Sequence, residues 1–499
     1  MAVVTVDTNL CNFNNACLRV CPTYAFNINV SKEYVQVNHK RCISCGHCVV
    51  TCPSDAIKYY DSISKVKKLL STQNKNIAIL DPSIAAEFPD ITDYRKFAGM
   101  VRQLGFNYVI EANFAIDLLA EKYNKLISNF QGKYYIFTNC PAIINLISKF
   151  FPTLIENLTP FVTPPIASTI VAKKIYGDDV KVTWIGPCIA AKEDIKQKAD
   201  IPQPDVVLTF KELRKLFIEN NIKESYLEFD DFDEPYGYLG ALLPLPEGFI
   251  DTLNLNNIPY YQNKIFTVSG RENVLEALKT FEKSPENIHH HLNIFYCDGC
   301  IMGPGMSVSN NKYLKQTYIK DYVNKRIQNK DYASHKKNIE EYNSLNLSTY
   351  YIADNQRLPD PPEEKIQEIL KIIGKKNIQS IESCRTCGYN SCRELAVAIA
   401  QGLAKPELCL NYSIKTKQEY IKNLKQTNEQ LQKNNDNLIK TEKEIKKQLS
   451  EISENAEMVA VILQKLNVAV VIADENFRII KSNKYFIKML GEEAAAIAE

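Results

Sequence analysis

The order of apolar and polar residues from position 75 to about 350 predicts strands that alternate with helices. Four short apolar runs have the length and composition of buried strands: NIAIL, YYIFT, VKVTWIG and LNIFYC. The stretches between them have helical patterns. Because such alternation is typical of parallel sheets with crossover helices, we expect a two-lobed α/β domain at 75–350 within a multidomain chain.

A different pattern follows in residues 412–460, where an apolar side chain returns every seven residues: Leu424, Leu431, Leu438, Ile445 and Ile452. A repeat of this length predicts a left-handed coiled coil. Asn428 and Asn435 at the intermediate core positions would specify register and a low oligomer number. We expect a homodimer. A single solvated helix is the alternative, because the apolar seam is thin.

Residues 461–499 begin with the pattern of a strand, an Asp-Glu-Asn turn, a second strand and an amphipathic helix that starts at Asn483. This order resembles the opening of a PAS domain, which implies a sensor or dimerisation module of α+β type. About 35 residues are present, whereas a complete domain needs roughly 100. We expect either a shortened chain or a copy that does not fold alone.

The charge and hydropathy of the sequence exclude some classes of function. The 60 Lys and Arg residues nearly balance the 58 Asp and Glu residues, which leaves a formal charge of +2 and favours no nucleic-acid partner. No run reaches the roughly 18 apolar residues of a membrane helix, and no leader is evident. These features predict a soluble, cytoplasmic protein that does not bind membranes.

The strongest candidates for functional residues are the fifteen cysteines, most of which occur in clusters along the chain. In a long chain without a leader, short regular cysteine spacings favour metal over disulfides. The run RCISCGHCVVTCP matches the ferredoxin pattern C-x2-C-x2-C-x3-C-P, in which the fourth cysteine binds the other cluster. Residues 1–62 thus resemble a bacterial two-cluster ferredoxin. One predicted ligand set is Cys21, Cys42, Cys45 and Cys48, and the other is Cys11, Cys17 and Cys52.

The second ligand set lacks one member, because Asn14 stands where the pattern has a cysteine. An amide is a poor replacement for thiolate on iron. We expect a three-iron cluster there, a labile four-iron cluster with a non-protein ligand, or no cluster.

Residues 362–411 contain a third group with the spacing C-x2-C-x4-C-x16-C: Cys384, Cys387, Cys392 and Cys409. A helix is expected between Ser391 and Ala404. The group resembles a small iron–sulfur domain of corrinoid and hydrogenase-linked proteins, which implies a 4Fe-4S cluster. Zinc is the alternative, since it also accepts four cysteines.

The last four cysteines follow predicted strands of the α/β domain, in FTNCPAI, IGPCIAAKED and FYCDGCIMGPG. Loops at the carboxyl ends of parallel strands are where such folds place their sites. We therefore expect one more cubane, held by Cys140, Cys188, Cys297 and Cys300. Four unrelated buried cysteines are the alternative.

These three loops resemble the signature loops of the iron-only (FeFe) hydrogenase family. The resemblance implies that the four cysteines hold the 4Fe-4S part of an H-cluster. It also implies that Cys297 or Cys300, of which Cys300 is the better match, bridges to a two-iron subsite with CO, cyanide and dithiolate ligands.

Several positions depart from the catalytic pattern of that family. Asn139 stands in the place of the cysteine that shuttles protons, and Ala191 in the place of the lysine that holds a cyanide. Gly186 replaces a methionine, the last loop has C-x2-C where the enzymes have C-x3-C, and Pro304 interrupts their glycine run. Lys192 is adjacent and could reach the site after a backbone shift. These departures are closer to the sensory branch of the family.

Three functions follow as hypotheses: a hydrogen- or redox-responsive signalling protein, a working hydrogenase, and a 4Fe-4S electron carrier without the two-iron subsite. The coiled coil and the PAS-like segment favour the first, which needs a signalling or electron-transfer protein partner. Linkers are expected near 62–75 and 350–365.

Overall fold

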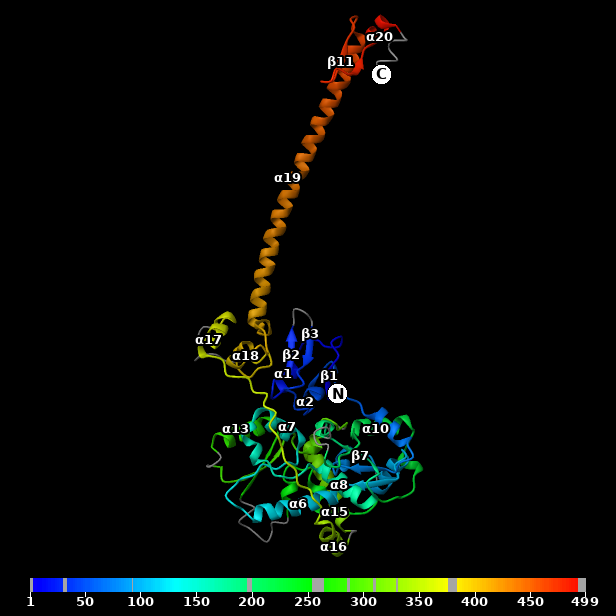
Figure 1. The fold of residues 1–499 in the computed structure, drawn as a ribbon, viewed down its shortest axis with the longest axis vertical. Coiled ribbons are helices and arrows are strands. Elements are labelled where there is room, and N and C mark those ends of the chain that lie inside the picture. The colour runs from blue at the N-terminus through cyan, green and yellow to red at the C-terminus, as the bar shows by residue number, and fades with distance from the viewer. Residues whose placement is uncertain are drawn as a thin grey trace. The chain divides into compact units, whose positions relative to one another are not determined.

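The computed structural model describes residues 3–29, 34–91, 93–194, 200–253, 264–284, 288–307, 311–328, 331–375 and 384–491. The chain forms two compact units, Met1–Tyr412 and Ser413–Glu499 (Figure 1). Parts of the predicted segments 362–411 and 461–499 lie outside the described residues.

The N-terminal region pairs its strands in two antiparallel ladders and places a short helix after each cysteine loop. The paired strands carry buried apolar residues on one side, which form a core that they share with the small C-terminal cysteine domain. The elements are β1 (Val4–Val6) with β4 (Ile57–Tyr59), β2 (Phe26–Asn29) with β3 (Tyr34–Val37), α1 (Ala16–Val20) and α2 (His47–Thr51).

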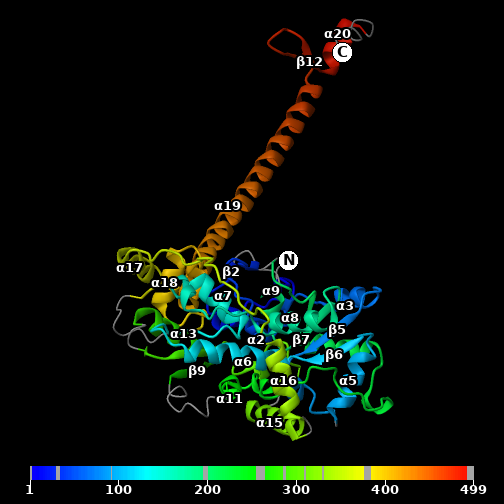
Figure 2. The same cartoon turned by 60° about the horizontal axis from the view of Figure 1, so that its bottom comes forward.

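A four-stranded parallel sheet with the order β6-β5-β7-β8 forms the centre of the next region; the sequence predicted a parallel sheet and two of these strands, β5 and β7. All five residues of β5 are buried, and successive side chains enter cores on opposite faces of the sheet. Helices α6 and α8 pack on one face, and α5 and α10 on the other (Figure 2). The bounds are β5 (Asn76–Leu80), β6 (Tyr108–Glu111), β7 (Lys181–Gly186), β8 (Val206–Thr209), α5 (Tyr94–Arg102), α6 (Asn113–Ser128), α8 (Pro164–Tyr176) and α10 (Phe210–Glu219).

A second lobe is built on the parallel pair β9 (Ile265–Ser269) and β10 (His291–Phe295). The strand predicted at YYIFT is wrong, because Ile136 makes only isolated bridges, to Leu158 and Leu292. The backbone around Ile136 hydrogen-bonds alternately to the segment of Leu158 and to the segment of Leu292, so no continuous ladder of hydrogen bonds forms. Helices α7 (Pro141–Phe150) and α13 (Arg271–Lys283) belong to this lobe, and the region also contains α4 (Ile84–Glu87), α9 (Ala191–Asp194), α11 (Gly248–Thr252), α15 (Lys312–Gln328) and α16 (Tyr332–Tyr342).

The linker predicted near 62–75 contains a helix, α3 (Ile63–Leu70). The apolar residues of α3 recur at helical spacing, and two of them, Ile63 and Val66, are buried in the core beside the sheet. This spacing outweighs the polar composition of the segment, so the prediction was wrong there. The second predicted linker has no regular structure over 351–362.

The small C-terminal cysteine domain contains α17 (Glu363–Ile372) and α18 (Cys392–Ala400). Ser391 caps α18 by accepting a hydrogen bond from the Glu394 backbone N–H at 3.0 Å. The start of this helix agrees with the sequence prediction.

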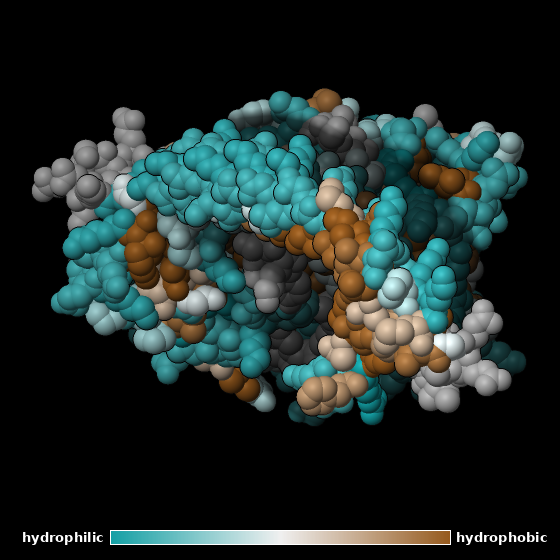
Figure 3. All heavy atoms as spheres, turned by 90° about the horizontal axis from the view of Figure 1, so that it is seen from above, coloured by the Kyte–Doolittle hydropathy of each residue, from teal (hydrophilic) through white to brown (hydrophobic). Residues whose placement is uncertain are grey.

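The second unit consists mainly of α19 (Leu410–Lys465), a helix of 56 residues that begins in the first unit. The hairpin of β11 (Val471–Ala473) and β12 (Ile479–Ser482) and helix α20 (Lys484–Leu490) follow it. Asn483 caps α20 through its Oδ1, which accepts from the Phe486 N–H at 3.0 Å. Figure 3 shows α19 as a mostly hydrophilic surface and the following segment as a gathering of apolar side chains. No helix of the described residues has the length and apolar character needed to cross a bilayer.

Candidate metal centre

The structure brings together the four cysteines that the sequence places in loops of the α/β region. Cys140 is the N-cap of α7, and Cys188 follows β7 by two residues. Cys297 follows β10, and Cys300 begins a short 3-10 helix. All four line one cavity of about 50 Å³.

Burial raises the pKa of all four thiols, to about 12 for Cys188. The charges of Cys140 and Cys188 raise the pKa of both Cys297 and Cys300 further. Without metal, these groups therefore stay protonated, whereas an iron ion deprotonates the thiols that it binds. Four converging thiols fit a 4Fe-4S cluster, which supplies one-electron transfer when it is bound.

Polar side chains without partners also line the cavity. Both polar atoms of the Asn139 amide and Nε1 of Trp184 are buried, and none has a hydrogen-bond partner among the described residues. Buried polar atoms are normally paired. The wall is therefore suited to a polar group that would complete these hydrogen bonds, such as the ligands of an inorganic cluster.

Sequence reasoning missed Asp81, whose buried carboxyl group belongs to the same wall. Its Oδ1 accepts hydrogen bonds from the backbone N–H and the hydroxyl of Ser83. Burial raises the pKa of Asp81 to about 6, although the bonds from Ser83 lower it. The sequence could have indicated Asp81 as a candidate site residue, because it directly follows the fully buried strand β5.

The structure separates the two residues predicted to lie at the reacting end of the site. Asn139 lies in the cavity wall with 5% of its surface exposed. Lys192 is not among the residues that line the cavity, although Ala190 and Ala191 are. Its predicted contact with a cyanide ligand is therefore not part of this geometry.

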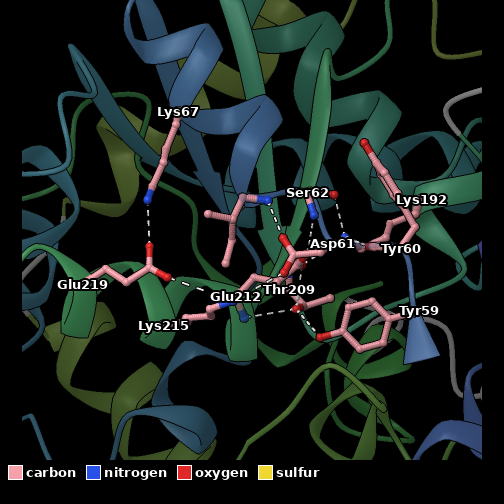
Figure 4. Close-up of polar contacts among 11 residues, drawn as sticks. Tyr59, Tyr60, Asp61, Ser62, Lys67, Lys192, Thr209, Glu212, Lys215 and Glu219 are labelled. Atoms are coloured by element: carbon pink, nitrogen blue, oxygen red, sulfur yellow. Dashed lines mark hydrogen bonds and ion pairs between the residues drawn. The ribbon is translucent and has the colours of Figure 1, made fainter. Parts of the chain in front are cut away.

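Lys192 instead forms a buried network between the end of the ferredoxin region and helix α10 (Figure 4). Its Nζ donates to both oxygens of Glu212 at 2.9 Å and to the Ser62 hydroxyl at 2.6 Å. Glu212 also accepts from the Ser62 N–H at 2.6 Å and caps α10 with Thr209. Burial lowers the pKa of Lys192, and Glu212 opposes this shift. The Lys192 ammonium group thus links its own segment to those of Ser62 and Glu212.

The cysteines of the two ligand sets predicted in the ferredoxin region influence one another. Burial raises the pKa of the Cys48 thiol, and the charges of Cys45, Cys21, Cys42 and Cys17 raise it further. Burial also raises the pKa of Cys17 to about 12, and the charges of Cys11, Cys21 and Cys52 add to this shift. Cysteines of both predicted ligand sets therefore lie near one another, and their division into two clusters stays a prediction.

The loop that carries Asn14 has the same backbone shape as the intact loop. Phe13 and Ser44, each two residues after the first cysteine of its run, have φ values of 56° and 57°. Two positions later, Asn15 and Gly46 also have positive φ values, of 60° and 76°. The loop with Asn14 thus keeps the turn of a cluster-binding loop while lacking its second sulfur.

Replacement of Asn14 with cysteine is expected to convert a three-iron paramagnetic resonance signal into a four-iron signal and to add about one iron per chain. The new thiol would occupy the place that Cys45 has in the matching loop. Asn14→Ser is the control and should keep the three-iron signal. A wild-type protein that already holds two intact four-iron clusters would contradict this expectation.

In the third group, burial raises the pKa of the Cys387 thiol, and the charges of Cys384, Cys409 and Cys392 raise it further. Among the described residues, no three His, Cys, Asp or Glu side chains lie close enough to surround a single metal ion. A cubane holds its four thiolates at separate corners, so its ligands stand farther apart than those of one ion.

Comparison with known families finds three matches. Residues 74–241 match the family described as iron only hydrogenase large subunit, C-terminal domain. Residues 9–56 match the 4Fe-4S dicluster domain, and residues 383–410 match a small Fe-S cluster family. The matched segments contain the cysteine groups of the ferredoxin region and the small domain.

Two curated relatives are hydrogenases. The chain is 28% identical to the NADP-reducing hydrogenase subunit HndD of Solidesulfovibrio fructosivorans over 41% of its own length, and it spans 40% of that relative. It is 24% identical to iron hydrogenase 1 of Clostridium pasteurianum over 75% of its own length and 76% of that relative.

Among solved structures, apo FeFe-hydrogenase HydA1 from Chlamydomonas reinhardtii aligns with 59% of this chain and 100% of its own, at 16% identity and a TM-score of 0.48. The family matches stand independently of that alignment. The chain therefore carries the C-terminal domain of an iron-only hydrogenase large subunit together with a 4Fe-4S dicluster domain and a small Fe-S domain.

Proposed function

We propose that this protein is a cytoplasmic hydrogen- or redox-responsive signalling protein with low hydrogenase turnover. Cys140, Cys188, Cys297 and Cys300 would hold the cubane of a hydrogenase-type cofactor, and Cys300 would bridge to a two-iron subsite. The ferredoxin and small-domain cysteines would hold further clusters for electron transfer. The state of the clusters would be passed to a protein partner through α19 and the PAS-like segment.

One observation carries the proposal: the cavity presents Asn139 where the resemblance to catalytic hydrogenases implies a proton-shuttling thiol. An amide does not exchange a proton near neutral pH. Loss of a positioned proton donor typically slows a reaction by about 10²–10⁴-fold. The side chains at this wall therefore favour binding and response over rapid turnover.

A working hydrogenase is the second candidate, because both curated relatives are hydrogenases. A dye-linked hydrogen-uptake assay on full-length protein, made with its maturation enzymes, distinguishes the two. We expect uptake at least about 10²-fold slower than that of a catalytic relative prepared in the same way. Equal rates would overturn the signalling proposal in favour of the enzyme.

We also propose that α19 pairs with α19 of a second copy. The leucines and isoleucines of its seven-residue repeat are 43–68% exposed in the single chain. A 56-residue helix with an uncovered apolar seam gains most of its stability by packing that seam against a partner. The resulting homodimer would place two PAS-like segments at one end of a shared coil.

Substitution of Leu438 by lysine is expected to halve the molar mass measured by light scattering. The new charge would lie in the seam, where it would have to be desolvated beside apolar neighbours. Gln432→Lys adds the same charge to α19 outside the repeat and should leave the dimer intact. A wild-type chain that is monomeric at all concentrations would refute the pairing.

A further inference from the structure

We propose that the site formed by Cys21, Cys42, Cys45 and Cys48, which contacts the hydrogenase-like cavity, is a junction that also exchanges electrons with the small Fe-S domain through Tyr24 and Tyr389. This inference deepens the proposed function and rests on it, since it names the route by which a change at the cavity would reach the C-terminal helix.

The first contact of the junction is with the hydrogenase-like cavity. Cys45 belongs to the ferredoxin loop and also lines that cavity. The neighbouring His47 places its Nε2 3.5 Å from Sγ of Cys297. Gly46 between them approaches so closely that an added Cβ would lie 2.6 Å from Ile189. The ferredoxin loop and the cavity wall are therefore in direct contact.

The second contact is with the small domain. Tyr389 follows Cys387 by two residues, is 1% exposed, and packs against Tyr24 in a tilted arrangement, with 4.4 Å between ring centroids. Tyr24 is three residues from Cys21, and its hydroxyl donates to Glu394 of α18 at 2.7 Å. Burial raises the pKa of Tyr389, and the charges of Cys387 and Cys21 raise it further. The two rings thus lie between one ligand of each cluster site.

Gly388 lets the small domain approach the ferredoxin region closely at this contact. Its φ is +92°, and a Cβ added there would lie 2.8 Å from Cβ of Leu18 and 3.2 Å from the carbonyl oxygen of Asn15. Both belong to the segment around α1, which leads to Cys21. No side chain larger than hydrogen fits without moving the small domain away from the ferredoxin region.

The intact four-cysteine group lies next to both contacts. Cys45 lines the cavity, and Cys21 is three residues from Tyr24, whose ring packs against Tyr389. In each exchange one site loses one electron and the other gains it, without bond formation or proton transfer.

The route ends at the start of α19. Cys409 is followed directly by Leu410, the first residue of that helix. An electron gained by the small-domain site adds one negative charge beside the helix N-terminus, where negative charge is favourable. The redox state of this site is therefore coupled by a covalent bond to the helix that we propose to carry the signal.

Gly388→Ala tests the junction, with Gly402→Ala as its matched control. Gly402 also has a positive φ, of +74°, but an added Cβ there meets nothing within 4 Å. The full-length protein with its clusters is reduced with dithionite and followed by paramagnetic resonance and by freeze-quench kinetics, without hydrogen. We expect magnetic coupling between the two sites, and electron exchange at least tenfold slower in Gly388→Ala at unchanged iron content.

Gly402→Ala is expected to match the wild type. If Gly388→Ala loses iron, the Tyr389→Leu variant is used to test the junction instead. It should also slow electron exchange between the two sites at least tenfold. Exchange at the wild-type rate in the deciding variant, or a wild type without coupling between these sites, overturns the junction. Because no hydrogen is used, this outcome is separate from failure of the hydrogen response.

Discussion

Replacement of Lys192 with methionine is expected to lower the free energy of unfolding by about 3–5 kcal/mol, because it leaves a buried charge without its partner. The side chains of Lys192 and Glu212 are only 2% and 5% exposed. After the change, the Glu212 carboxylate would still accept from the Ser62 N–H and from the Thr209 N–H and hydroxyl, but it would lose its ion pair with the ammonium group. Methionine has a similar length, so the loss is mainly electrostatic.

Lys67→Met is the matched control, because Lys67 also pairs with a glutamate, at 2.7 Å, but is 53% exposed. An exposed pair contributes about 0.2–1 kcal/mol. Trp184 is the single tryptophan and lies buried in the central sheet, so its fluorescence during urea unfolding reports on this region. Equal losses in the two variants would show that Lys192 does not have the structural role assigned to it.

Asn139→Cys is expected to raise the rate of hydrogen uptake by about 10²-fold or more, provided that the two-iron subsite is bound. The change places a thiol in the cavity wall, where the resemblance implies a proton shuttle. Asn139 is 5% exposed and both of its polar atoms lack partners among the described residues, so a smaller side chain fits without breaking a hydrogen bond. The dye-linked assay measures the gain.

Asn139→Ser is the control, because its hydroxyl has nearly the size of the thiol but does not release a proton near neutral pH. We expect it to stay at the wild-type rate. If Asn139→Cys also stays there while its infrared spectrum matches the wild type, proton delivery at this position does not limit turnover. The low-turnover proposal would then need another physical basis.

The cysteine groups were predictable from the sequence because each ligand set follows a local pattern or the end of a strand. NIAIL and VKVTWIG are continuous apolar runs, and such runs favour central parallel strands. Residues that follow these strands meet at one edge of the sheet. Sheet geometry accounts in this way for Cys188, which follows β7, whereas Cys297 and Cys300 follow β10 of the second lobe and Cys140 follows no regular strand.

The environment of Lys192 was not predictable in this way. Its partners Ser62 and Glu212 lie 130 and 20 residues away in the sequence, and no local pattern links them. The same holds for Tyr24 and Glu394, which are 370 residues apart. Contacts of this kind depend on how whole regions pack, which the periodicity of a single segment does not specify.

Infrared spectroscopy of the full-length protein, produced with its maturation enzymes, tests the central claim most directly: that the cavity of Cys140, Cys188, Cys297 and Cys300 holds a hydrogenase-type cofactor. We predict bands from CO and cyanide that are lost in Cys300→Ser and retained in Cys387→Ser. Absence of these bands from the matured wild-type protein, or their persistence in Cys300→Ser, would contradict the account.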